Sequence, residues 1–153
     1  MPTRIILYAS ARSNGNTAVI AQYLAKVLDA PSIDLSARAM APFSYENDYP
    51  NGDAYLETLQ EILPFDEWIF LTPVYWYTMS AQMKIFIDRF SDVLRYHPQF
   101  RPAIVGKGMW AMCCSSTAEH KGELHTWGGR VQELKPAVKD LIDGFIAEHQ
   151  FYK

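Results

Sequence analysis

The first thirty residues constrain the fold more than any other part of the sequence. Residues 4–9 form a short, almost unbroken apolar run, RIILYA, which is typical of a strand buried on both faces of a parallel sheet. A polar turn follows at once, and apolar residues then recur at helical spacing from residue 17 to residue 28. A strand, a tight loop and a helix in this order predict an α/β fold.

The same alternation of strand and helix continues along the chain. Short apolar runs predict further strands at residues 32–35, 68–72 and 109–114. Helical spacing predicts helices over residues 56–63 and 134–149. Alternating elements of these two kinds predict a doubly wound parallel sheet, in which helices cover both faces.

A further helix is predicted to begin after Ser80, whose hydroxyl can cap the first turn. Its core face is expected to comprise Met83, Phe86, Ile87, Phe90 and Leu94. Lys84 and Asp88 stand four residues apart and are expected to form a solvated pair. Two interpretations of Arg89 stay open, because it could brace a neighbouring loop or subunit, or lie at the surface.

The stretch between the fourth strand and the last helix breaks this rhythm. Residues 115–130 should hold a helix and a fifth strand, yet residues 122–127 already have a strand-like pattern. A parallel crossover needs about a dozen residues or more, and too few separate the two strands. Either the fourth crossover helix is missing, or a segment is absent from the sequence.

Size and composition favour one soluble domain over residues 1–153. The chain is 49% hydrophobic, which suits a single compact core. Its 14 Lys and Arg stand against 17 Asp and Glu, so we expect no nucleic-acid partner. No apolar stretch approaches the ~20 residues of a membrane span. The adjacent Cys113 and Cys114 form no disulfide framework, which favours a reducing, cytoplasmic setting.

The loop between the first strand and the first helix has the composition of an anion site. It comprises Ser10, Ala11, Arg12, Ser13, Asn14, Gly15, Asn16 and Thr17. Hydroxyl groups and free backbone N–H groups at a helix N-terminus bind a phosphate, aided by the helix dipole. A Walker loop would need a Lys where Asn16 stands, so a monophosphate fits better than ATP. The alternative is that these residues form a surface turn and a helix cap.

A second loop, residues 72–80, follows a later strand of the same sheet. It contains Pro73, Val74, Tyr75, Trp76 and Tyr77. Ligands of open α/β sheets bind at the carboxyl edge, beside the point where the strand order reverses. Three consecutive aromatic residues there could form a flat apolar wall for a ring. The alternative is that they pack onto the protein's own surface or onto a dimer partner.

A phosphate site and an aromatic wall on one edge together describe a binding site for flavin mononucleotide (FMN). Over these two loops, and on through residues 81–90, the sequence resembles the flavodoxin-like NADPH-dependent FMN reductases and quinone reductases. The resemblance implies that Ser10, Arg12, Ser13, Asn16 and Thr17 surround the FMN phosphate and that Pro73, Val74, Tyr75 and Trp76 line the isoalloxazine ring. It also implies that the loop after the fourth strand, which includes Ser115 and Ser116, covers another side of the flavin.

The family resemblance implies a flavodoxin-like fold and an FMN-dependent oxidoreductase. Electrons would pass from NAD(P)H as co-substrate to a small acceptor such as a quinone, a nitro or azo compound, or a free flavin. Such enzymes commonly form homodimers or homotetramers, and neither a catalytic side chain nor a metal ligand is expected. The alternatives are a flavodoxin-type electron carrier and a non-catalytic flavodoxin-like domain.

Overall fold

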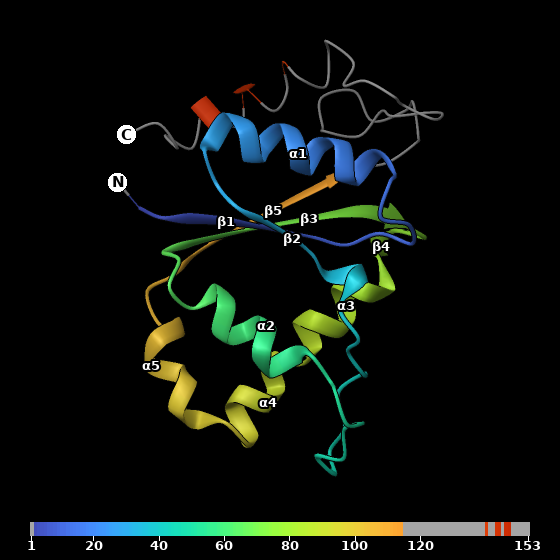
Figure 1. Ribbon diagram of the computed structural model, residues 1–153, viewed down its shortest axis with the longest axis vertical. Helices are drawn as coiled ribbons and strands as arrows, with labels where there is room; N and C mark the ends of the chain where they lie inside the picture. The colour runs from blue at the N-terminus through green and yellow to red at the C-terminus, as the bar shows by residue number, and fades with distance from the viewer. Residues whose placement is uncertain (1, 115–139, 141–142, 145, 148–153) are drawn as a thin grey trace.

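Four parallel strands form the central sheet of the computed structural model, which describes residues 2–114, 140, 143–144 and 146–147 (Figure 1). The strands are β1 (Arg4–Tyr8), β2 (Ser32–Asp34), β3 (Glu67–Tyr75) and β5 (Gly108–Cys114). They pair in the order β2-β1-β3-β5. This is the order of the first four sheet strands in flavodoxin-like folds, and it places the reversal of strand order between β1 and β3.

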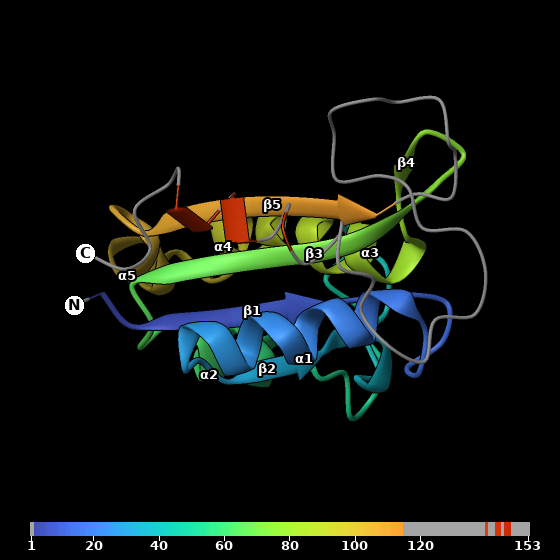
Figure 2. The ribbon, with the colours of Figure 1, turned by 90° about the horizontal axis from the view of Figure 1, so that it is seen from above.

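Helices cover both faces of this sheet, as the alternation of elements predicts (Figures 1 and 2). One face carries α1 (Asn16–Leu28), and the other carries α2 (Tyr55–Ile62) and the helices that follow β4. Alternate residues of β1 explain the two cores, because Ile6 packs toward α1 while Ile5 and Leu7 pack toward α2. The predicted doubly wound α/β fold is therefore confirmed.

The segment between β3 and the next helix is a hairpin rather than a plain loop. Residues 73–75 continue β3, and β4 (Thr78–Met79) returns antiparallel to it, with Val74 opposite Met79. The expected strand end at residue 72 is thus three residues too early. Pro73 is tolerated inside β3 at this point, where the strand leaves the body of the sheet.

The helix predicted after Ser80 is two helices. Helix α3 (Ala81–Asp88) ends at Arg89, and α4 (Phe90–Arg95) begins directly after it. Ser80 caps α3 as predicted, because its hydroxyl accepts a hydrogen bond from the Met83 N–H. The change of direction turns Leu94 outward to 61% exposure, so its predicted place in the core is wrong.

Several connecting elements had no clear periodic pattern in the sequence. The 3₁₀ helix η1 (Leu35–Ala37) follows β2 and takes in Leu35, the last residue of the predicted strand 32–35. A second 3₁₀ helix, η2 (Pro98–Phe100), and the short α5 (Arg101–Ile104) lead from α4 to β5. No helix in the described part of the chain has the length and apolar character of a membrane span.

Most of the C-terminal predictions fall outside the described residues. These include the doubtful crossover at 115–130, with Ser115 and Ser116, and most of the helix predicted over 134–149. Within that last range, the described residues are helical, and Ile146 is buried against the α1 side of the core. The hydroxyl of Tyr23 on α1 donates a hydrogen bond of 2.8 Å to Asp143 in the same segment.

Candidate functional site

The two loops singled out in the sequence meet at the carboxyl edge of the sheet. Strands β1 and β3 are parallel neighbours, with Tyr8 opposite Leu71. The Ala9 N–H continues this pairing by donating to the Leu71 carbonyl at 3.1 Å. The chain that follows β1 and the chain that follows β3 therefore leave the sheet side by side, at the same end of the molecule (Figure 2).

The first loop leads into α1 without a capping side chain. Gly15 is the N-cap residue, so no side chain accepts a hydrogen bond from the first turn, and that turn carries no acidic residue. Arg12, Ser13 and Asn14 are exposed around it. Backbone N–H groups at a helix start, with hydroxyl groups and a guanidinium beside them, form a donor set that fits a phosphate monoester.

Gly15 also determines how tightly this loop closes. A Cβ atom added at Gly15 would lie 3.0 Å from Nε and 3.3 Å from Cγ of Arg12. The Arg12 side chain therefore lies directly over the Gly15 backbone, a position that a larger residue would obstruct. The Arg12 side chain therefore lies close to the start of α1.

The tip of the β3–β4 hairpin presents two aromatic side chains to solvent. Trp76 is 93% exposed and Tyr77 is 95% exposed. Both residues have positive φ, 49° and 66°, as in the two-residue hairpin turns that glycine and asparagine usually occupy. Left-handed backbone costs a non-glycine residue roughly 1–2 kcal/mol. Strain of this kind is concentrated at ligand-binding sites, so the turn is a candidate binding element.

Direct hydrogen bonds join the two loops. The hydroxyl groups of Ser10 and Tyr75 lie 3.2 Å apart. Below them, the buried Ser80 hydroxyl donates to the Ala9 carbonyl at 3.1 Å, and the Ser80 N–H donates to Thr72 Oγ1 at 2.9 Å. The end of β1 and the hairpin are thus fixed to each other, with a donor-rich loop on one side and aromatic rings on the other.

Ser36 is a site residue that the sequence analysis missed. Its hydroxyl accepts a hydrogen bond of 2.9 Å from the Ser10 N–H and donates one of 2.7 Å to the Ser10 carbonyl. Asp34 in turn accepts from the Ser36 N–H at 2.9 Å. Both backbone polar groups of Ser10 are satisfied in this way. No local sequence pattern predicts this contact, because the two serines are 26 residues apart.

The third neighbour of the site is the end of β5. Thr17, in the first turn of α1, lies with its hydroxyl 3.4 Å from the Cys114 sulfur, and both side chains are buried. Burial raises the pKa of the Cys114 thiol, so this group stays protonated near neutral pH. Cys114 therefore acts as packing at the base of the loop.

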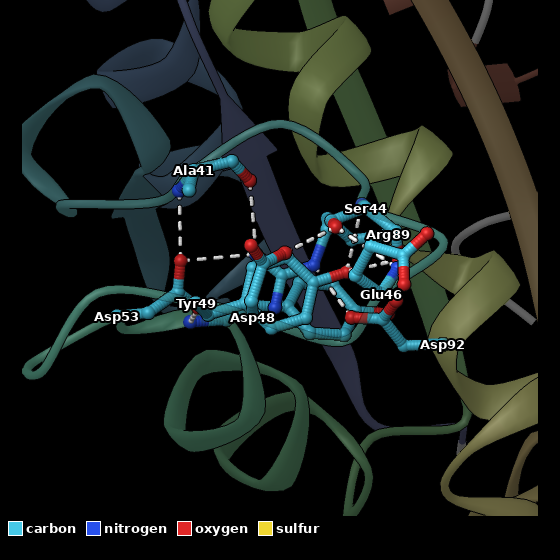
Figure 3. Close-up of polar contacts among 9 residues, drawn as sticks. Ala41, Ser44, Glu46, Asp48, Tyr49, Asp53, Arg89 and Asp92 are labelled. Carbon is cyan, nitrogen blue, oxygen red and sulfur yellow. Dashed lines mark hydrogen bonds and ion pairs between the residues drawn. The ribbon is translucent and has the colours of Figure 1, made fainter.

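A buried ionic cluster joins the end of α3 to the loop that precedes α2 (Figure 3). Arg89 is 1% exposed, and its side chain contacts Asp92 at 2.5 Å and Asp53 at 2.9 Å. It also donates to the Ala41 carbonyl at 2.9 Å and lies over the Tyr49 ring, 3.5 Å from its centroid. Of the two interpretations left open, Arg89 braces a neighbouring loop, and the surface role is wrong.

The predicted pair on α3 lies where the sequence indicates. Lys84 and Asp88 form an ion pair with side chains 53% and 44% exposed, so solvent surrounds it. Among the described residues, no group of three or more His, Cys, Asp or Glu side chains could hold a metal ion.

The described residues of both loops fit the two ends of FMN. The uncapped α1 terminus, Arg12 and the Ser10 and Ser13 hydroxyls suit the charged phosphate. The exposed aromatic turn suits a flat ring. The contact between Ser10 and Tyr75 joins these two groups of residues directly. Ser115 and Ser116, the remaining predicted contacts, lie outside the described residues.

Comparisons with known proteins agree with this arrangement. Residues 3–126 match the profile of the family described as NADPH-dependent FMN reductase. A curated Bacillus subtilis protein, named as an NAD(P)H-dependent FMN-containing oxidoreductase, is 35% identical over 100 residues. That match covers 62% of this chain and 55% of the relative, so it spans little more than half of the relative's length.

Solved structures show the same fold. The Trp repressor binding protein from Bacillus subtilis superimposes with a TM-score of 0.57 and 26% identity, covering 98% of this chain and 76% of that one. An NADH:FMN oxidoreductase in its apo form gives a TM-score of 0.62 at 17% identity, covering 97% and 88% of the two chains. A flavodoxin, WrbA-like protein from Agrobacterium tumefaciens gives a TM-score of 0.54 at 20% identity, covering 78% and 63%.

Proposed function

The chain belongs to the NADPH-dependent FMN reductase family, and from this we propose that it binds FMN at the joined loops and passes electrons from NAD(P)H to a small acceptor. The observation that carries the proposal is the hydrogen bond between Ser10 and Tyr75, which unites a phosphate-binding loop with an aromatic turn. Acceptors of the proposed class are quinones, nitro or azo compounds, and free flavin.

At the phosphate end, the residues of the first loop act as hydrogen-bond donors. The proposed set is Ser10, Arg12, Ser13, Asn14, Gly15, Asn16 and Thr17. The start of α1 contributes its backbone N–H groups and the positive end of the helix dipole. Because Ser36 holds Ser10 by both backbone groups, this loop is prepared for the phosphate before the ligand arrives.

At the ring end, the hairpin supplies the surface against which the isoalloxazine lies. The proposed set is Pro73, Val74, Tyr75, Trp76 and Tyr77, completed by Ser115 and Ser116 after β5. The exposed rings of Trp76 and Tyr77 would offer a flat apolar surface to the isoalloxazine.

When bound, FMN would supply the redox chemistry, which is hydride transfer from NAD(P)H and electron transfer to the acceptor. The protein's part is to position the ring, to neutralise the phosphate charge and to admit each flat partner in turn. No side-chain nucleophile or general base is needed.

The visible spectrum of the purified protein and a titration with FMN test binding directly. A flavin absorption band and saturable uptake of FMN are expected. Steady-state oxidation of NADPH with menadione then tests turnover, and a rate well above that of free FMN is expected. A protein that binds FMN but gives no turnover with any acceptor of the class would be an electron carrier instead.

The same proposal extends to the organisation of the protein. We take residues 1–153 as a single flavodoxin-like FMN-binding domain that works in the cytoplasm as a homodimer or homotetramer. The exposed Trp76 and Tyr77 are available to a second copy of the chain. Sedimentation equilibrium with and without FMN tests the assembly, and a monomer at all concentrations contradicts it.

A further inference from the structure

Tyr75 contacts the phosphate-binding loop through its hydroxyl, although its ring belongs to the hairpin. Tyr75 is 41% exposed, whereas Ser10 is 6% exposed. The Tyr75 hydroxyl lies 3.2 Å from Ser10 Oγ. This contact joins the first loop directly to the end of β3, next to the hairpin turn. The remaining links lie one layer deeper, at Ser80 and Thr72.

The hydrogen-bonding capacity of Ser10 determines what this contact does. Ser36 engages both backbone groups of Ser10, so the hydroxyl is the remaining hydrogen-bond donor of Ser10. A serine hydroxyl has one proton to donate and two lone pairs to accept with. If the tyrosine hydroxyl donates to Ser10 Oγ, the serine proton is free for a further acceptor. A phosphate oxygen is an acceptor only, so this arrangement suits it.

We propose that Tyr75 is a positioning residue that makes this site selective for a flavin carrying a phosphate. This role rests on the proposed function. Tyr75 acts through Ser10, because the phenol orients the serine hydroxyl so that its proton points to the phosphate. In return, a bound phosphate holds Tyr75, and with it the first residue of the aromatic turn. Riboflavin has the same ring but no phosphate, so its binding gains nothing from the contact between Tyr75 and Ser10.

The test compares FMN and riboflavin binding by quenching of flavin fluorescence in the wild type, Tyr75→Phe, Ser10→Ala and the double variant. Tyr75→Phe keeps the ring and removes only the hydroxyl. Losing one hydrogen bond to a charged acceptor is expected to weaken FMN binding about five- to tenfold, with riboflavin binding unchanged. In the Ser10→Ala background, Tyr75→Phe is expected to add no further loss for FMN. Tyr45→Phe, in a different and exposed loop, is the matched control.

Each outcome decides the matter. Equal weakening of both flavins by Tyr75→Phe means that the Tyr75 hydroxyl does not act through the phosphate, and it overturns the inference. Unchanged FMN binding, or a full additional loss in the Ser10→Ala background, overturns it as well. A wild type that binds neither flavin overturns the proposed function itself, so the two failures are distinguishable. Thermal unfolding of each variant excludes a fold defect, because an Ala or Phe variant that unfolds at the wild-type temperature is folded.

Discussion

The guanidinium group of Arg89 lies 2.9 Å from the carboxylate of Asp53, so a cation at the α3–α4 junction holds the loop that precedes α2. Both side chains are almost fully buried, at 1% and 8% exposure. Asp92 provides a second carboxylate for the same cation. The break between α3 and α4 and the path of the long loop after η1 therefore depend on one side chain.

Removing this cation is expected to be costly for folding. Arg89→Met leaves Asp53 and Asp92 buried without their partner, and breaking a buried pair in this way costs about 3–5 kcal/mol. Lys84→Met, on the neighbouring helix, breaks an exposed pair and is expected to cost about 0.5 kcal/mol or less. Urea unfolding at equilibrium measures both. Similar losses in the two variants would mean that the buried cluster contributes no more than a surface pair.

The same cluster predicts how the free energy of unfolding depends on pH. Burial alone would raise the pKa of the Asp53 carboxyl, but hydrogen bonds from Arg89 and from the Ala41 and Tyr55 N–H groups outweigh it and hold that pKa below its ordinary value. Stability from a lowered carboxyl pKa is fully present above the unfolded value of about 3.9 and is lost as the pH falls through the folded value. We therefore expect Asp53→Asn to be less stable than the wild type at pH 7.

Unfolding free energies measured from pH 7 down to pH 3 check this prediction. The gap between wild type and Asp53→Asn is expected to narrow once the pH falls below about 4, because the unfolded chain then binds a proton that the folded protein resists. A gap that stays constant over the whole range would show that the Asp53 charge is not the source of the difference.

Substitutions at the hairpin tip are expected to raise the stability of the protein and to weaken FMN binding. Replacing Trp76 with Asn and Tyr77 with Gly supplies residues that accept positive φ, which is expected to raise the unfolding free energy by about 1–2 kcal/mol. The same change removes the aromatic wall and is expected to weaken FMN binding at least tenfold. Asp29→Gly is the control, since Asp29 has φ of 48° at the end of α1 and lies outside both loops. It should gain stability without altering FMN binding.

Gly15 offers a test of the loop that is proposed to bind the phosphate. Its φ of −89° is open to alanine, but the added Cβ would come within 3.0 Å of Arg12 Nε. Gly15→Ala is therefore expected to displace the Arg12 side chain and to weaken FMN binding about tenfold, with little change in stability. Gly144→Ala is the matched control, because a Cβ there meets nothing within 4 Å. Isothermal titration with FMN compares the two, and equal affinities would contradict the role given to Gly15.

The sheet and the helices α1 and α2 could be predicted because their patterns are local. Residues 4–9 and 68–72 are apolar runs that only a doubly covered sheet buries well, and the described strands match them within a few residues. The hairpin was missed because Trp76 and Tyr77 adopt a turn that sequence rules assign to glycine and asparagine. A two-residue strand such as β4 also leaves too little pattern to detect.

The predictions for the candidate site divide in the same way. The two loops were found from composition at the ends of predicted strands, and the structure brings Ser10 and Tyr75 together. The contacts of Ser36 with Ser10 and of Arg89 with Asp53 were not predicted, because the partners are 26 and 36 residues apart. Such contacts are fixed by the packing of whole elements, and no window of sequence contains both partners.

Trp76 and Tyr77 project almost wholly into solvent from a turn whose backbone is set by the pairing of β3 with β4. These two side chains can therefore be replaced without changing the packing of the core. If these rings define which flat molecules approach the flavin, the choice of oxidant can diversify among relatives by replacing two residues. The residues of the sheet would not have to change, so acceptor preference could change through this turn while the fold stays the same.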